Sequence, residues 1–120
     1  MTMEPFPEEH DLIALFECEP ILTDKGVPWS YNHLTFTTAR GDDRIVCGIE
    51  PGYHTLKFEW SKGGERLVSL DLNCVAGIRT ENQGGTEALV VAFRDKNLTP
   101  LRIQLKPCVS VSWGTNIEPE

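Results

Sequence analysis

Apolar and polar residues alternate with a period of two through most of the chain between Tyr31 and Trp113. The stretch HTLKFEW, residues 54–60, is the clearest example, because polar residues separate its three large apolar side chains. Successive side chains of an extended strand point to opposite faces, so this pattern places one face in a core and the other in water. The alternation therefore predicts a protein built from half-buried β-strands.

Seven segments carry this strand pattern, and turn-forming residues separate them. They are HLTFTTAR (33–40), RIVCGIE (44–50), HTLKFEW (54–60), ERLVSLDLNCVAGIR (65–79), EALVVAFR (87–94), LTPLRIQLK (98–106) and CVSVSW (108–113). Because the connections are short, neighbours in sequence are expected to pair antiparallel. We predict an all-β or mostly β fold, an antiparallel meander of about seven or eight strands that forms a barrel or a sandwich.

Three of these segments have additional features. In the long segment 65–79, Gly77 is expected to introduce a bulge or a bend. The segment 87–94 is almost continuously apolar, which is typical of a central strand covered on both faces. Pro100 indicates an edge position or the start of a strand. The inward positions of all the segments give the expected core: Leu34, Phe36, Ile45, Cys47, Ile49, Leu56, Phe58, Trp60, Leu70, Leu72, Val91, Phe93, Ile103, Leu105, Val111 and Trp113.

The N-terminal part of the chain is harder to assign. The apolar residues of HDLIALFECEP, residues 10–20, fit both an alternating strand and a helix of two turns. We expect a strand, because Pro20 follows closely and the next apolar pair can extend the same edge. The chain is predicted to form a single β domain over residues 9–114, with flexible tails at residues 1–8 and 115–120.

Charge is distributed very unevenly along the 120 residues. The formal net charge of −7 belongs entirely to residues 4–24, which contain seven carboxylates and no lysine or arginine. The remainder of the chain carries 11 acidic and 11 basic residues. A protein that binds a polyanion needs a positive surface, so the charge argues against nucleic acid and against an anionic membrane as partners.

No sequence motif indicates catalysis or a cofactor. The chain lacks the local patterns that position a nucleophile, a metalloprotease histidine pair or a phosphate-binding loop. Its three histidines, at positions 10, 33 and 54, lie far apart, and we interpret them as solvated turn or edge residues. We therefore expect a protein that is not an enzyme and that uses neither a metal nor another cofactor.

The four cysteines also lack the spacing of a metal site. Cys47 and Cys74 follow the inward alternation of their segments, so we expect both to be buried thiols. Spacing alone leaves two alternatives open, which are a disulfide and a reactive cysteine.

The acidic segment has two interpretations. It can be a solvating arm that keeps the protein soluble. Alternatively, the apolar run LIALF, residues 12–16, must be buried, and this would hold its acidic neighbours close to a folded surface. A fixed group of carboxylates suits a basic protein partner and accelerates its encounter. On this second interpretation the partner-binding carboxylates are Asp11, Glu17, Glu19 and Asp24.

Two aromatic residues in the following loop are candidate anchors for the same partner. Trp29 and Tyr31 lie in GVPWSYN, which precedes the first confident strand. They would either contribute to a contact patch or pack over the open end of a barrel. Trp60 and Trp113, in contrast, fall on inward strand positions and are expected in the core.

In overall character the chain resembles the immunity proteins that protect bacteria from polymorphic and contact-delivered toxins. The segments EEHDLIALFECEPILTD (8–24) and GVPWSYNH (26–33) are surfaces that such a protein could use. The resemblance implies a small, acidic, cytoplasmic, cofactor-free protein that neutralises a cognate basic toxin domain by direct binding. A cytoplasmic location is also expected because the N-terminus lacks the pattern of a secretory signal and no apolar run is long enough to span a bilayer.

The alternative function is a lipocalin-like barrel that binds a small apolar ligand. The large inward side chains of Phe58 and Trp60 argue against it, because they would fill the space that a ligand needs. Cavity volume is a property of the tertiary structure, so this alternative remains open at the level of sequence.

Overall fold

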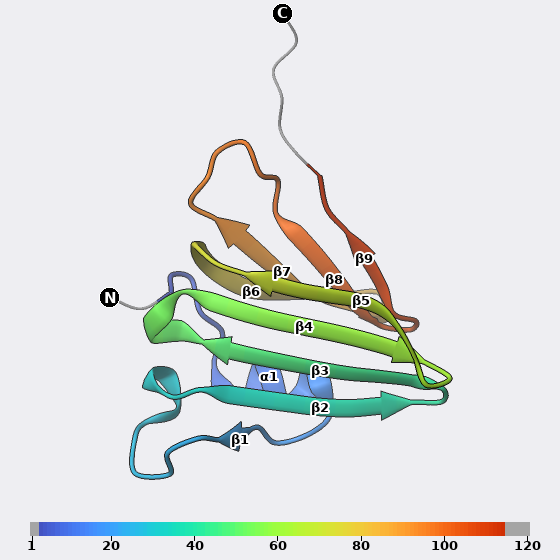
Figure 1. The fold of residues 1–120 in the computed structure, drawn as a ribbon, viewed down its shortest axis with the longest axis horizontal. Helices are drawn as coiled ribbons and strands as arrows, with labels where there is room; N and C mark the ends of the chain where they lie inside the picture. The colour runs from blue at the N-terminus through green and yellow to red at the C-terminus, as the bar shows by residue number, and fades with distance from the viewer. Residues whose placement is uncertain (1–2, 115–120) are drawn as a thin grey trace, which may run out of the picture.

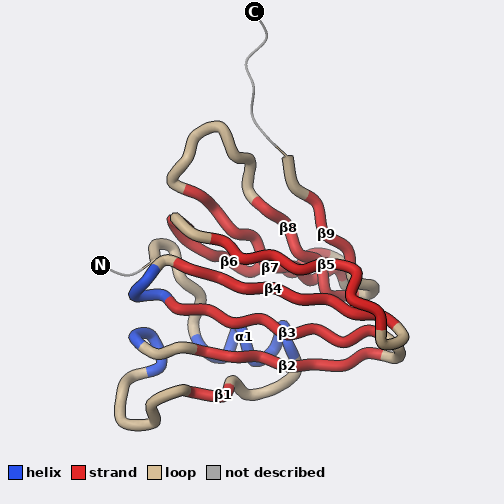
Figure 2. Tube along the Cα trace, in the orientation of Figure 1, coloured by secondary structure: helices blue, strands red, loops and turns tan. Residues whose placement is uncertain are grey.

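The computed structural model describes residues 3–114, which form two antiparallel sheets and one α-helix (Figures 1 and 2). The first sheet has the order β1 (Ile21–Leu22), β2 (Leu34–Arg40), β3 (Asp43–Glu50), β4 (Thr55–Lys62) and β5 (Glu65–Leu72). The second has the order β6 (Val75–Gln83), β7 (Thr86–Phe93), β8 (Leu101–Lys106) and β9 (Ser110–Ser112). The predicted mostly β antiparallel meander is confirmed. The sheets form two layers and are not closed into one barrel.

The predicted long strand over residues 65–79 is divided between the two sheets. The division falls at Cys74, whose φ of 58° is left-handed. The inward and outward alternation that the sequence pattern extended through Cys74 therefore breaks at this residue. The prediction that Cys74 is buried is therefore wrong, since its side chain is exposed. The irregularity expected at Gly77 is confirmed by a register shift between Val75 and Gly77 where β6 pairs with β7.

Residues 9–16 form the helix α1 (Glu9–Phe16), so the strand that we expected within residues 10–20 is wrong there and the helical alternative is correct. The Glu8 N–H donates to Oδ2 of Asp11 at 3.2 Å, which satisfies one free donor of the first turn. Glu17 ends the helix with a left-handed φ of 57°. A helix of eight residues is unstable by itself, so its stability comes from packing of the buried face.

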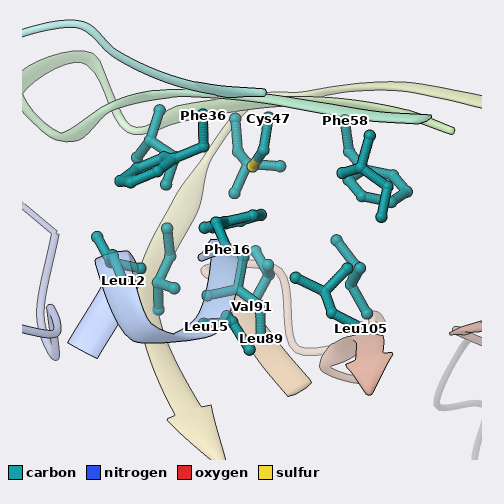
Figure 3. Close-up of a cluster of buried hydrophobic side chains, with 14 of the residues drawn as sticks. Leu12, Leu15, Phe16, Phe36, Cys47, Phe58, Leu89, Val91 and Leu105 are labelled. Atoms are coloured by element: carbon teal, nitrogen blue, oxygen red, sulfur yellow. The ribbon is translucent and has the colours of Figure 1, made fainter. Parts of the chain in front are cut away.

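The helix fills the space between the two layers. It contacts β2 of one sheet and both β6 and β7 of the other. Phe16 stacks on Phe36 with ring centroids 4.7 Å apart. Figure 3 shows Leu12, Leu15 and Phe16 of α1 among side chains from both sheets. Burial of three large apolar residues outweighed the strand-like alternation, because only the helical spacing directs all three toward one core.

Most of the predicted core is confirmed. The buried members are Leu34, Phe36, Ile45, Cys47, Ile49, Leu56, Phe58, Leu72, Val91, Ile103 and Leu105, whereas Trp60, Leu70, Phe93 and Val111 are partly buried. Trp113 is 42% exposed, so its assignment to the core is wrong. Its ring covers Phe93 at 5.3 Å between centroids, and its indole N–H donates to the Thr99 carbonyl at 3.0 Å.

The N-terminal residues from Met3 onward are packed, in place of the loose tail expected over residues 1–8. Met3 is buried, the Glu4 N–H donates to the Ala76 carbonyl at 2.9 Å, and the Ile78 N–H donates to the Pro5 carbonyl at 2.8 Å. These bonds cover the edge of β6. Residues 1–2 and the predicted tail at 115–120 lie outside the described residues.

Candidate partner-binding site

Two short 3-10 turns meet at one end of the first sheet. They are η1 (Trp29–Tyr31), which precedes β2, and η2 (Pro51–Tyr53), which joins β3 to β4. In Figure 1 this end is at the left, where β2 begins and β3 ends. A surface hollow of about 350 Å³ lies here, and we call it the tyrosine hollow. Its lining residues are Thr23, Asp24, Val27, Tyr31, Asn32, His33, Glu50, Gly52 and Tyr53.

The buried amide of Asn32 holds one wall of the tyrosine hollow in place. Its Oδ1 accepts the N–H of Asp24 at 3.1 Å and the N–H of His33 at 2.9 Å. Its Nδ2 donates to the carbonyls of Asp24 and Val27. A side chain that is only 5% exposed thus satisfies four backbone groups of a loop that has little regular structure.

The charge of the tyrosine hollow is negative. Asp24 and Glu50 contribute carboxylates, and no lysine or arginine is among the lining residues. The Gly26 N–H donates to Oδ1 of Asp24 at 3.0 Å, which fixes that carboxylate at the turn. His33 Nδ1 lies 3.9 Å from Oε2 of Glu50, so the imidazole and this carboxylate are neighbours at the wall of the hollow.

Two tyrosine rings border the hollow and face solvent. Tyr31 is 67% exposed and Tyr53 is 78% exposed, so both rings present most of their surface to water. Aromatic residues with this exposure are enriched in protein interfaces, where burial of the ring is accompanied by a hydrogen bond from its hydroxyl. The hollow therefore combines apolar surface with fixed negative charge.

A second depression of about 290 Å³ adjoins the hollow on the outer face of the first sheet, and we call it the outer groove. A row of directly paired residues crosses it, namely Thr35, Gly48, Lys57 and Asp71. Gly48 has no side chain, and a Cβ there would lie 3.2 Å from Nε2 of His33. His33 lines both depressions, so they form one continuous surface.

Three of the six predicted partner-binding residues lie at this end of the sheet. Asp24 and Tyr31 line the tyrosine hollow. Trp29 belongs to the same turn as Tyr31 but is partly buried, with its ring centroid 5.3 Å from that of Phe6. Trp29 thus supports the turn from beneath, while Tyr31 is presented at the surface.

Glu17 lies at the opposite end of the sheet. Its carboxylate is 3.7 Å from Arg40 at the end of β2 and 3.4 Å from Lys106. Asp24 instead follows the residues that pair with Leu34 at the beginning of β2. At the usual rise of a strand, the length of β2 separates these two ends by about 20 Å. The predicted carboxylates therefore do not form one compact cluster.

The remaining two predicted residues, Asp11 and Glu19, differ in the number of contacts that their carboxylates make within the protein. Asp11 caps α1 and lies 3.4 Å from His10, so its charge already has partners within the protein. Glu19 is exposed on the segment between α1 and β1. Of the four predicted carboxylates, Glu19 and Asp24 are the ones with the fewest internal contacts among the described residues.

Sequence reasoning missed Asn32, His33, Glu50 and Tyr53 as members of this surface. The loop GVPWSYNH contains the first two, but no local pattern indicated that an asparagine there would be buried. Glu50 and Tyr53 come from another connection, and only the pairing of Leu34 with Ile49 brings the two loops together. A predicted register for β2 and β3 would have placed Glu50 and Tyr53 beside the loop that contains Tyr31.

The cysteines are free thiols in the structure. Burial raises the pKa of the Cys47 thiol to about 12. Partial burial also raises the pKa of the Cys18 thiol, although a hydrogen bond with the Thr37 backbone opposes this shift. Among residues 3–114, no three histidine, cysteine or acidic side chains are grouped so that they could hold a metal ion. No helix of the described chain has the length and apolarity to cross a membrane.

Neither a family model nor a curated protein matches the sequence. The structure, however, matches a chain of a "Contact-dependent growth inhibition toxin - immunity protein complex from Klebsiella pneumoniae 342" with a TM-score of 0.80. The two chains share one fold. The match covers 96% of this chain and 99% of that chain at 14% sequence identity. The expected resemblance is thus confirmed at the level of the fold, since this chain shares its fold with a chain of a toxin–immunity protein complex.

Proposed function

We propose that this chain is an immunity protein that binds a cognate toxin domain and neutralises it. The observation that carries the proposal is the end-to-end match to a chain of a toxin–immunity complex. The net charge of −7 favours the immunity role over that of a toxin acting on nucleic acid, because a nuclease needs positive charge to hold its substrate.

The proposed partner is a basic protein domain, and the proposed mechanism is occlusion. An acidic protein can cover the positive cleft of a toxin by occupying the place of its anionic substrate. This role needs no catalytic group and no cofactor in the immunity protein. It would take place in the cytoplasm of the protected cell, where an incoming toxin would act.

The proposed contact surface is the end of the first sheet that contains the tyrosine hollow. Asp24 and Tyr31 supply charge and aromatic surface there, Trp29 supports the turn, and Glu19 is exposed on the segment that leads into β1. The carboxylates of Asp11 and Glu17 already interact with neighbouring groups of the protein. We therefore assign them to the overall negative field and not to close contacts with the partner. Long-range attraction depends on the summed charge, whereas close contacts depend on individual free groups.

The lipocalin-like alternative finds no support in the structure. In a ligand-binding barrel the space enclosed by the strands would be available to a small molecule. Here the sheets are not closed into a barrel, and the space between them contains α1 and the stacked rings of Phe16 and Phe36.

The proposal predicts a toxin gene beside the gene for this chain, and the test is co-expression with the toxin domain that it encodes. In a susceptible bacterium the toxin domain alone should arrest growth, and this chain should restore it and co-elute with the toxin in gel filtration. A matched control is an unrelated toxin domain of similar charge, from which this chain should give no protection. Growth arrest that persists with the adjacent toxin domain, or no toxin gene beside this one, contradicts the proposal.

A further inference from the structure

The two most exposed aromatic residues of the described chain lie beside the same concavity. Tyr53 at 78% and Tyr31 at 67% exceed the exposure of Trp113, which is 42%. They come from η2 and η1, which are in contact, although the residues are far apart in sequence. Leaving two large rings in water is unfavourable relative to burying them, so the arrangement is typical of a surface that another molecule covers.

The concavity between these rings has a definite charge. Its lining contains the carboxyl groups of Asp24 and Glu50 and the imidazole of His33, whose side chain is 39% exposed. The Thr55 hydroxyl donates to Oε1 of Glu50 at 3.4 Å, which holds that carboxylate at the rim. A cation entering the hollow would therefore meet two negative groups and no resident lysine or arginine.

The walls are also held in advance of any binding event. Four hydrogen bonds of the Asn32 amide fix the loop that carries Asp24 and the start of β2. The opposite wall follows β3 directly, since Glu50 is its last residue. A site that is already ordered loses less conformational entropy on binding, and this increases the affinity obtained from a few contacts.

We propose that the tyrosine hollow receives an arginine side chain of the toxin partner. A guanidinium group is planar, so it can lie against a tyrosine ring while its N–H groups donate to a carboxylate. A lysine ammonium is more strongly hydrated and lacks the flat face, so it would use this combination less well. The inference rests on the proposed function, because it specifies how the partner of that same surface is recognised.

The adjoining outer groove gives the partner's main chain a place to continue. Gly48 forms a position without a side chain in the middle of β3, beside His33. The group that approaches Gly48 closely is the His33 ring of this chain, which lines both depressions and connects the outer groove with the tyrosine hollow. The arginine would thus occupy the hollow while neighbouring residues of the partner lie over the first sheet.

The first experiment measures toxin binding by calorimetry for the wild type and two hollow variants. Tyr53→Ala should raise the dissociation constant about 30-fold, as expected for a central aromatic anchor. The double variant Asp24→Asn with Glu50→Gln should raise the dissociation constant at least tenfold. The difference from the wild type should be smaller in high salt, because salt screens the charges. Leu67→Ala and Glu65→Gln are matched controls on β5, and both should bind as the wild type does.

The second experiment does not need the toxin. N-acetyl-L-arginine amide, titrated into the isolated protein, should shift the NMR signals of Tyr31, Tyr53 and His33 in a saturable manner. The shifts should disappear in the double carboxylate variant, and N-acetyl-L-methionine amide should produce none. A wild type that fails to bind the toxin contradicts the proposed function, whereas the arginine titration still decides what the hollow accepts. Toxin binding unchanged in Tyr53→Ala, or no arginine-specific shifts, overturns the inference.

Discussion

Asp24 and Asn32 are joined by two hydrogen bonds that run in opposite directions. The Asp24 N–H donates to Oδ1 of Asn32 at 3.1 Å, and the Asn32 amide donates back to the Asp24 carbonyl. This pair closes the loop between β1 and β2 on itself. It fixes the wall of the tyrosine hollow and contributes to stability as well as to the candidate site.

Replacing Asn32 with Ala should destabilise the protein by about 2–3 kcal/mol, since buried backbone groups lose their partners. Chemical denaturation in urea measures this loss. Asn97→Ala is the matched control, because Asn97 is exposed and its hydrogen bond to Oδ1 of Asp95 uses its backbone N–H. If both variants have the same unfolding free energy, the loop does not depend on the Asn32 amide.

Gly77 is the residue at which the N-terminal segment crosses β6. A Cβ at this position would overlap the backbone carbonyl of Glu4. We expect Gly77→Ala to displace residues 3–6 and to cost about 1–3 kcal/mol, the usual range for overpacking. Denaturation and the rate of limited proteolysis near the N-terminus are the measurements. Gly52→Ala, where a Cβ meets nothing within 4 Å, should behave nearly as the wild type.

The buried Cys47 thiol should make stability fall at alkaline pH. Its pKa is raised to about 12 in the folded protein. In the unfolded chain a cysteine ionises near pH 8.5, so above that pH the unfolded state releases a proton that the folded state keeps. The unfolding free energy contributed by this group is fully present below about pH 8.5, and it decreases by about 1.4 kcal/mol per pH unit above it.

Urea denaturation between pH 8 and pH 10 would reveal this effect, with Cys47→Ala as the comparison. The variant loses stability at every pH because it leaves a small cavity, but its stability should decline less steeply as the pH rises. Parallel pH profiles for the two proteins would show that Cys47 does not cause the decline.

The exposed carboxylates should control association with a basic partner more than the internally paired ones do. Neutralising Glu19 and Asp24 by Gln and Asn should slow the on-rate about tenfold at low salt, by removing free charge near the contact surface. Neutralising Asp11 and Glu17 in the same way removes equal formal charge, but we expect a smaller change. Stopped-flow association at two ionic strengths distinguishes them. Equal slowing in both variants would mean that net charge alone steers the encounter.

The strand alternation determined most of the first sheet and the centre of the second. Residues such as Phe36, Cys47 and Phe58 had to share one face, because a period of two leaves no other arrangement once the strands pair antiparallel. The glycine inside the strand pattern identified the β6 irregularity at Gly77. These are local properties, so sequence contained them.

Tertiary packing decided the features that local pattern left ambiguous. The segment around Leu12 and Phe16 satisfied both helical and strand periods, and only the space between the two sheets selected the helix. At Cys74 the alternation continued in sequence, although the backbone turned there into the second sheet. Local periodicity shows which side chains share a face of one helix or strand. It carries no information about which layer of the fold that face packs against.

The candidate site shows the same division. The unpaired acidic charge of residues 4–24 and the aromatic loop were visible in the sequence, and they pointed to Asp24 and Tyr31. That Glu17 lies at the other end of the sheet beside Arg40, and that Tyr53 joins the hollow, required the pairing of β1, β2 and β3. Sequence determined the charge and the strand period because both belong to individual residues and their neighbours. The tertiary structure alone decided which charges became paired, since that depends on distances between residues far apart in the chain.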